Sequence, residues 1–319
     1  MHPRNKLERV LENVSNGRAY SEYVNEFVRT RLCESMRFSD DFLSWRRKST
    51  FVKEIDEAYA CLYRVREIMQ KRERSGRNSS DECDDKVRFI DMCSGKGFLS
   101  LLLAFEYPRA SVDMIDISNK VDLTHLRAKE TNNVRFHRLD LKSDECHEIV
   151  DSACANGEFV FLVGVHLCGD LSRVAIELFR RAHLRNRNNN TAIVLSPCCL
   201  PQRRRHDCFG YHVKDQAKGL KLDNYKLWCI FLSLEMRSSL KLTLNDLANQ
   251  KGGVHMMQDY NMLANENSGK VEDVKNIFLC CLLCPSTPDS SITNSSSKGD
   301  CKIVASITNA SKWKIVRKK

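Results

Sequence analysis

The sequence lacks any uninterrupted apolar run near the roughly 20 residues that a membrane-spanning helix needs. Its first ten residues, MHPRNKLERV, carry charge but no apolar segment of the kind found in secretory signals. We therefore expect a protein that is neither membrane-bound nor secreted. On the same ground we expect no glycan on triplets such as Asn294-Ser295-Ser296.

The cysteines also lack the pattern of a disulfide framework. The chain has 15 of them, an odd number, spread from Cys33 to Cys301. Small secreted domains instead carry even sets of cysteines at close and regular spacings. We expect reduced thiols and a cytoplasmic or nuclear location.

The composition excludes wholesale disorder. Of 319 residues, 42% are hydrophobic and 29% are charged, which suffices for one large domain or a domain with an appendage. Lys and Arg total 51 against 41 Asp and Glu, a net charge of +10. This excess permits a nucleic-acid partner but does not require one.

Residues 1–85 are predicted to form a helical N-terminal extension and a linker. Apolar residues recur every three or four positions from Leu7 to Met36 and again from Phe51 to Met69, as in amphipathic helices. We interpret these apolar positions as core and assign them no chemistry. The stretch Arg72–Asp85 is polar and aperiodic, which is typical of a linker.

Residues 86–285 have a different sequence pattern, in which short apolar runs alternate with helical stretches. This rhythm predicts parallel strands buried on both faces between helices. The runs span 87–92, 110–117, 134–141, 159–165 and 191–195. A helix over 222–236 and a final strand over 276–283 follow, while the polar stretch 241–267 supports no assignment. Residues 286–319 read as a low-complexity segment and a basic tail.

The most informative segment is VRFIDMCSGKGFLSLLL, which spans 87–103. A strand leads to Asp91, a turn carries Gly95 and Gly97, and a helix begins near Phe98. Glycine allows positive φ and a close approach of the backbone to a ligand. The helix start presents unpaired N–H groups to such a ligand. On its own, this pattern also fits an ordinary tight turn.

Two acids downstream favour a cofactor site. Nineteen residues after Gly97, a second apolar run ends at Asp116, where a carboxylate can hold ribose hydroxyls. A third run ends at Asp140, which would lie beside an adenine ring. Each acid alone could be a solvated helix cap. Together with Asp91, their spacing around the glycine turn predicts a crevice for a nucleoside cofactor.

These residues resemble the S-adenosylmethionine-binding motifs of class I Rossmann-like methyltransferases. The resemblance implies an α/β fold with a seven-stranded sheet, mostly parallel with an antiparallel last strand, and S-adenosylmethionine as cofactor. It assigns Asp91 to the methionine end, Asp116 to the ribose and Asp140 to the adenine, and it lines the cofactor with Cys93, Ser94, Gly95 and Gly97. Cys93 departs from the family, which has glycine at this position. Ser100 stands where dinucleotide-binding dehydrogenases have a third glycine.

Two later motifs narrow the resemblance to one family of methyltransferase domains. HLCGDLS begins at His166, and SPCC ends at Cys199. This pair is similar to a methyltransferase-domain family that includes the glutathione S-transferase C-terminal-domain-containing protein. That family is related to tRNA ribose 2'-O-methyltransferases of the acceptor stem. The similarity implies a reaction type more firmly than a substrate.

Four side chains in these motifs have several possible roles. His166, Cys168, Cys198 and Cys199 could shape the acceptor pocket, and His166 could act as a general base. The thiols could also act as nucleophiles or as metal ligands. Adjacent cysteines chelate poorly and no C-x2-C pair accompanies them, so we predict no metal. The candidate catalytic residues are His166, Cys198 and Cys199.

Arg203, Arg204 and Arg205 follow the fifth predicted strand directly, at the edge of the sheet that holds the predicted site. They could contact RNA phosphates or form an ordinary solvated face. We expect an RNA acceptor, of tRNA type, contacted by these arginines. A protein or small-molecule acceptor, or a non-catalytic interaction module, are the alternatives.

Overall fold

The computed structural model describes residues 5–18, 20–74, 87–185, 191–200, 209–240, 253–259 and 277–283. All of them belong to one compact unit, Met1–Pro285. Most of the predicted linker, the three arginines at 203–205 and the predicted segment 286–319 lie outside the described residues. Within the described part, no helix combines the length and hydrophobicity that a membrane span requires.

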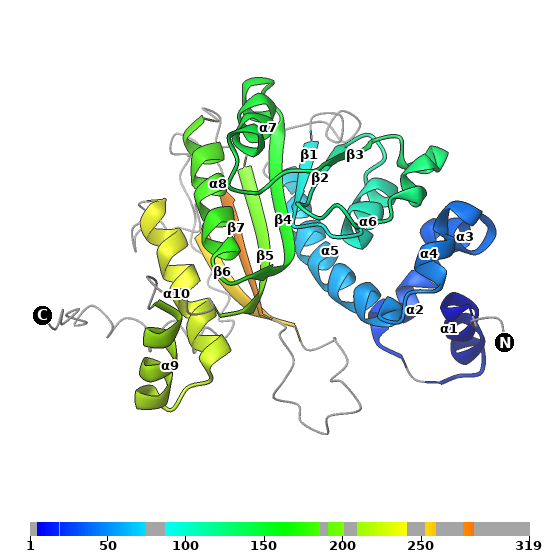
Figure 1. Ribbon diagram of the computed structural model, residues 1–319, viewed down its shortest axis with the longest axis horizontal. Helices are drawn as coiled ribbons and strands as arrows, with labels where there is room; N and C mark the ends of the chain where they lie inside the picture. The colour runs from blue at the N-terminus through cyan, green and yellow to red at the C-terminus, as the bar shows by residue number, and fades with distance from the viewer. Residues whose placement is uncertain are drawn as a thin grey trace, which may run out of the picture. The chain divides into compact units, whose positions relative to one another are not determined.

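The centre of the unit is a seven-stranded sheet with the strand order β3-β2-β1-β4-β5-β7-β6. Strands β1 to β5 pair in parallel, and β7 is antiparallel to both β5 and β6 (Figure 1). The predicted fold class, a mostly parallel α/β sheet with an antiparallel last strand, is confirmed. The strands are β1 (Val87–Met92), β2 (Ser111–Ile115), β3 (Val134–His137), β4 (Phe159–Cys168), β5 (Thr191–Cys199), β6 (Gly253–Gln258) and β7 (Ile277–Leu283).

The observed strands begin close to the starts of the predicted apolar runs, but several of them end at different residues from those runs. Strands β4 and β5 continue three and four residues past the predicted 165 and 195, and β3 stops before 141. Strand β6 falls in the stretch 241–267, where the sequence supported no assignment. It lies at the sheet edge and pairs only with β7, so its residues GVHMMQ show no continuous apolar run.

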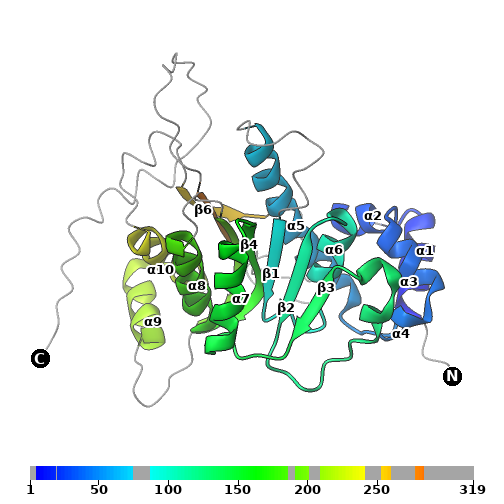
Figure 2. The same ribbon diagram turned by 90° about the horizontal axis from the view of Figure 1, so that it is seen from above.

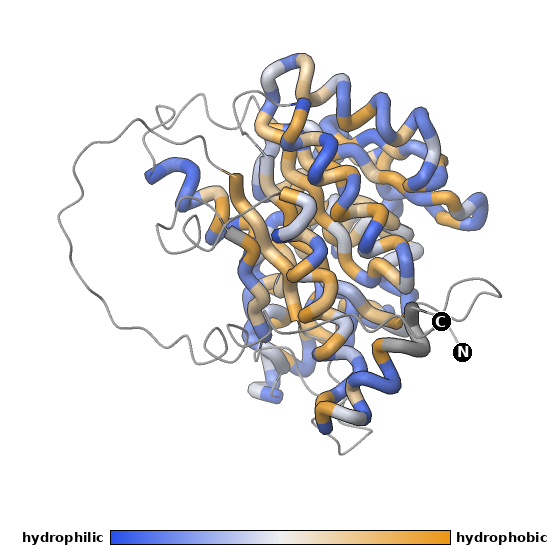
Figure 3. The backbone as a smooth tube through the Cα atoms, turned by 90° about the vertical axis from the view of Figure 1, so that its left-hand side faces the viewer, coloured by the Kyte–Doolittle hydropathy of each residue, from blue (hydrophilic) through white to orange (hydrophobic). Residues whose placement is uncertain are grey.

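Helices cover both faces of the sheet (Figures 1 and 2). One face packs against α7 (Asp144–Ala155), α8 (Leu171–Arg185) and α10 (Asn224–Ser239), with α9 (Phe209–Leu220) beside α10. The other face packs against α5 (Phe51–Arg74) and α6 (Phe98–Glu106). Hydrophobic residues gather in the strands and on the inner sides of the helices (Figure 3). Burial on both faces explains why β1, β4 and β5 read as continuous apolar runs.

The helices of the N-terminal region share one hydrophobic core with the sheet. They are α1 (Lys6–Ser15), α2 (Glu22–Phe27), α3 (Arg31–Phe38), α4 (Leu43–Arg46) and α5. The rings of Phe27, Phe51 and Phe98 lie 5.8–5.9 Å apart, which joins α2 and α5 to α6. Arg66 of α5 reinforces this contact, because its guanidinium donates to Glu106 of α6 at 2.7 and 2.9 Å. Helix α5 also contacts β4, β5 and β7 directly.

Candidate active site

The turn between β1 and α6 strains any side chain placed at Gly97. This residue has φ +80°, and a Cβ placed on it would lie 2.2 Å from Met114 Cε and 2.8 Å from Met114 Sδ. Gly95 also has positive φ, at +54°. Cys93, at the position where the family has glycine, adopts φ 57°. A residue other than glycine in this left-handed region carries a conformational cost on the order of 1 kcal/mol.

Asp116 is joined to this turn by hydrogen bonds. Its Oδ2 accepts from the backbone N–H of Gly95 at 2.8 Å, and its Oδ1 accepts from the N–H of Ser118 at 2.8 Å. The carboxylate thus holds the end of β2 against the glycine turn. Each oxygen keeps a second lone pair, which is what a bond to a ribose hydroxyl would use.

A pocket of about 240 Å³ opens beside the turn. Its walls come from the end of β1 and the turn, from the end of β4, and from the segment around the start of α5. The lining residues are Lys48, Glu54, Glu57, Ala58, Asp91, Cys93, Ser94, Gly95, Lys96, Phe98, Leu99, Val165 and His166. Of the predicted site residues, the structure brings Asp91, Cys93, Ser94, Gly95 and His166 into this one lining.

Asp91 is a buried carboxyl in the pocket lining. Its side chain accepts a hydrogen bond from Ser100 Oγ at 2.6 Å, and the residue is only 2% exposed. Burial raises the pKa of Asp91 to about 7, against the lowering effect of the Ser100 hydroxyl, and the charge of Asp116 adds to the rise. Among the described residues, this carboxyl has no ion-pair partner. A ligand cation would therefore offset the cost of its ionisation.

Ser94 contributes a hydroxyl that has no hydrogen-bond partner among the described residues. Its backbone N–H donates to the carbonyl of Ile115 at 3.1 Å. Its Oγ is buried and forms no hydrogen bond within the described part of the chain. Buried hydroxyls are nearly always hydrogen-bonded in folded proteins. Since Ser94 lines the pocket, a polar ligand bound there would satisfy it.

Two lysines place ammonium groups beside the acids of the pocket lining. The Nζ atoms of Lys48 and Lys96 each lie 4.8 Å from the centre of the Trp45 ring. Burial lowers the pKa of Lys96 more than the charge of Asp122 raises it, and Lys48 lowers it further. Lys48 also pairs with Glu54 at 2.8 Å. The pocket thus combines a buried acid with two ammonium groups, a set that suits an amino-acid end with both an amine and a carboxylate.

His166 is held at the end of β4 by an acid from α5. Its Nε2 lies 2.5 Å from Oε2 of Glu57, whose side chain is 12% exposed. The pairing of β4 with β5 shifts register between Val165 and Leu167, and His166 itself has φ 65°. This local bulge directs the imidazole toward α5 while Leu167 packs on the other face of the sheet.

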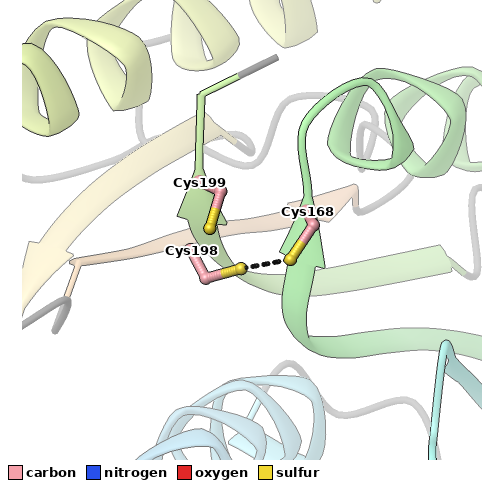
Figure 4. A group of neighbouring side chains, drawn as sticks. All are labelled: Cys168, Cys198 and Cys199. Atoms are coloured by element: carbon pink, nitrogen blue, oxygen red, sulfur yellow. Dashed lines mark hydrogen bonds between the residues drawn. The ribbon is translucent and has the colours of Figure 1, made fainter. Parts of the chain in front are cut away.

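Cys168, Cys198 and Cys199 form a separate group (Figure 4). Their three Sγ atoms lie within 4.8 Å of one another, and the Sγ atoms of Cys168 and Cys198 are 2.7 Å apart. Burial raises the pKa of the Cys198 thiol, and its bonds to the other two thiols raise it further. The hydroxyl of Tyr225 donates to the carbonyl of Pro197 at 2.9 Å and so fixes the end of β5. None of the three cysteines lines the pocket that contains His166.

The remaining predicted residues lie outside the pocket lining. Asp140 is exposed, three residues past the end of β3, and its Oδ1 accepts from the N–H of Lys142 at 2.9 Å. Asp116 and Gly97 shape the turn without lining the pocket. Sequence reasoning missed Lys48, Glu54 and Glu57, because we interpreted the N-terminal helices only as core. The sequence carries no signal that singles out Glu57, because Lys53, Glu54 and Asp56 are charged neighbours in the same helix.

Comparison with known proteins finds similarity to one kind of domain. Residues 52–205 match a family model described as a methyltransferase domain. The matched stretch runs from α5 through β5 and includes the pocket lining from Glu54 to His166. No curated protein matches the sequence significantly.

Solved structures similar to this chain include two methyltransferases. The plantazolicin methyltransferase BpumL in complex with SAH is 12% identical, with a TM-score of 0.37, over 87% of this chain and 98% of that one. The aminoglycoside resistance methyltransferase NpmB1 is 14% identical, with a TM-score of 0.36, over 64% of this chain and 91% of that one. Similarity this distant says nothing about the substrate.

Proposed function

We propose that the protein is a class I methyltransferase that uses S-adenosylmethionine and transfers the methyl group to RNA, of tRNA type. The observation that carries the proposal is the pocket at the end of β1, where a turn with two glycines adjoins a buried acid, two lysines and a hydroxyl that has no partner among the described residues. The methyltransferase-domain match supports the same reaction.

The residues present fit the cofactor. Gly95 lines the pocket with open space where a Cβ would lie, and Ser94 Oγ has no hydrogen-bond partner among the described residues. Asp91 would hold the amino group of the methionine end, and Lys96 with Lys48 would hold its carboxylate. Asp116 would take the ribose hydroxyls. Asp140 would lie at the adenine, as the family resemblance implies.

When bound, S-adenosylmethionine supplies a methyl group on a positively charged sulfur. The chain's own contribution is to position the acceptor and to remove its proton. With the Nε2 proton of His166 donated to Glu57, Nδ1 remains as the proton acceptor. The Glu57 carboxylate then stabilises the imidazolium that forms. The roles of Cys198 and Cys199 as candidate catalytic residues remain a prediction from the sequence.

The choice of RNA has its support in the sequence. The net charge is +10, and Arg203–Arg205 follow β5 directly. Resemblance to relatives of acceptor-stem tRNA methyltransferases points the same way. A protein or small-molecule acceptor, or a module that binds without catalysis, would give a different result in the transfer experiment below.

A binding experiment tests the cofactor assignment through Lys96. Calorimetry would compare S-adenosylhomocysteine with 5'-methylthioadenosine, which lacks the amino-acid end. We expect Lys96→Met to weaken the first ligand roughly tenfold or more and to leave the second unchanged, because only the first has a carboxylate. Lys129→Met, at an exposed position outside the pocket, is the matched control. Equal losses for both ligands would refute the assignment of Lys96.

A transfer experiment tests the reaction and the acceptor. Tritiated-methyl S-adenosylmethionine would be incubated with the protein and with RNA, protein or small-molecule fractions. We expect label in RNA, lost in His166→Asn and kept in His147→Asn, a histidine of α7 outside the pocket. Label only in another fraction would overturn the RNA acceptor. No transfer to any fraction, despite cofactor binding, would favour the non-catalytic module.

A further inference from the structure

The sulfur group at the ends of β4 and β5 has a geometry that the sequence did not suggest. Adjacent residues of a regular strand point to opposite faces, so Cys198 and Cys199 should not approach the same partner. Here the Cα pairing is Leu167 with Pro197 and then Cys168 with Cys199, which skips one residue of β5. This irregularity gathers both adjacent thiols around Cys168 (Figure 4). The objection that an adjacent cysteine pair chelates poorly does not hold for this arrangement.

We propose that Cys168, Cys198 and Cys199 bind one zinc ion as thiolates. Tetrahedral zinc with Zn–S bonds of about 2.3 Å requires sulfur atoms roughly 3.8 Å apart. The three Sγ atoms already lie within 4.8 Å of one another. The pair at 2.7 Å would separate by about 1 Å when the ion enters, which side-chain rotation can supply.

The chemistry of the donors selects the ion. Three sulfur atoms favour a soft or borderline cation such as Zn²⁺ over Mg²⁺ or Ca²⁺, which prefer oxygen. Binding converts three thiols into thiolates and releases three protons, so that the site changes from neutral to a net charge of −1. Among the described residues, no fourth histidine, cysteine or acid joins the group, so the described part of the chain supplies three of the four ligands of a tetrahedral site.

The ion would cross-link two strand ends that support the pocket. Cys168 lies two residues beyond His166, and the thiols of β5 lie next to the carbonyl that Tyr225 holds. Fixing β4 to β5 at this point would hold the bulge that orients His166. The proposal does not depend on the proposed reaction, because it concerns only the metal and the three thiols.

The test uses the full chain, purified under anaerobic and reducing conditions and freed of metal with a chelator. Co²⁺, a spectroscopic substitute for Zn²⁺, would be titrated in and then displaced by Zn²⁺. We expect one Co²⁺ per chain, an intense thiolate-to-cobalt absorption band and the visible bands of tetrahedral cobalt. Cys198→Ser and Cys199→Ser should lose these bands. Cys154→Ser is the matched control and should keep them, because its hydroxyl can still donate to the carbonyl of Ala182.

A second measurement needs no variant. The wild-type chain would be alkylated with and without Zn²⁺, and the modified cysteines would be mapped by mass spectrometry. We expect Zn²⁺ to protect Cys168, Cys198 and Cys199 and to leave the reactivity of the other thiols unchanged. Bands that survive in both serine variants, or equal alkylation with and without Zn²⁺, would overturn the proposal. So would a Cys168–Cys198 disulfide that persists under reducing conditions.

Discussion

Replacing Asp91 by Asn should change how stability depends on pH. The native pKa of Asp91 is raised from 3.8 to about 7, chiefly by burial. Between pH 3.8 and about pH 7, the folded state keeps a proton on Asp91 that the unfolded state has lost. The free energy of unfolding therefore falls by roughly 1.4 kcal/mol for each unit by which the pH rises. Asn cannot ionise, so the variant does not lose this free energy of unfolding as the pH rises. Its amide oxygen can still accept the hydrogen bond from Ser100.

The magnitude follows from the two pKa values. From pH 5 to pH 8 the unfolding free energy of the Asp91→Asn variant relative to wild type should rise by about 3 kcal/mol. The buried amide NH₂ adds a roughly constant penalty, so the change with pH is more diagnostic than the sign at any one pH. Urea unfolding followed by circular dichroism at pH 5, 6, 7 and 8 measures the difference.

Asp113 of β2 is the matched control, since it is equally buried at 1% exposure. Burial acts to raise its pKa, but the hydrogen bond from His137 and the charge of Arg88 outweigh burial and lower it. Asp113→Asn leaves Arg88 without its 2.6 Å partner and should destabilise the fold at pH 8. The reasoning would be refuted if the difference in unfolding free energy between Asp91→Asn and wild type stayed constant from pH 5 to pH 8. It would also be refuted if Asp113→Asn stabilised the fold at pH 8.

Three further substitutions test packing around the site. Gly97→Ala should destabilise the fold by about 1–3 kcal/mol and weaken S-adenosylhomocysteine binding, because alanine is strained at φ +80° and its Cβ would displace the end of Met114 in the turn; calorimetry that finds normal affinity would contradict this. Arg66→Met should lower the unfolding free energy in urea by about 1 kcal/mol, because it removes the ion pair with Glu106, and this difference from wild type should shrink in high salt. Tyr225→Phe should cost about 1 kcal/mol in thermal unfolding by freeing the carbonyl at the end of β5, and an unchanged Tm would show that this bond contributes nothing.

The sequence was most informative where physical constraints are local. Strands buried on both faces must be apolar throughout, which is why β1 and β4 could be read directly from their letters. The glycine turn is also local, because Gly97 must have positive φ. Strand β6 was missed because an edge strand paired on one side needs no such run.

The parts of the site that could not be predicted depend on distant contacts. His166 and Glu57 are 109 positions apart, and no periodicity in α5 marks one acid as facing a strand end. The grouping of Cys168 with Cys198 and Cys199 depends on a skipped residue in the pairing of β4 with β5, which leaves no trace in composition. The RNA contact of Arg203–Arg205 stays a prediction.

Helix α5 is both a wall of the pocket and a part of the core. Glu54, Glu57 and Ala58 line the pocket from one side, while Phe51, Ile55 and Leu62 of the same helix are at most 1% exposed. Swinging this wall outward to admit a bulky acceptor would expose the core, at a cost of several kcal/mol. Helix α5 therefore cannot move outward to open the pocket. Under the proposed function, an acceptor would therefore reach His166 past the strand ends, while the wall formed by α5 stays in place.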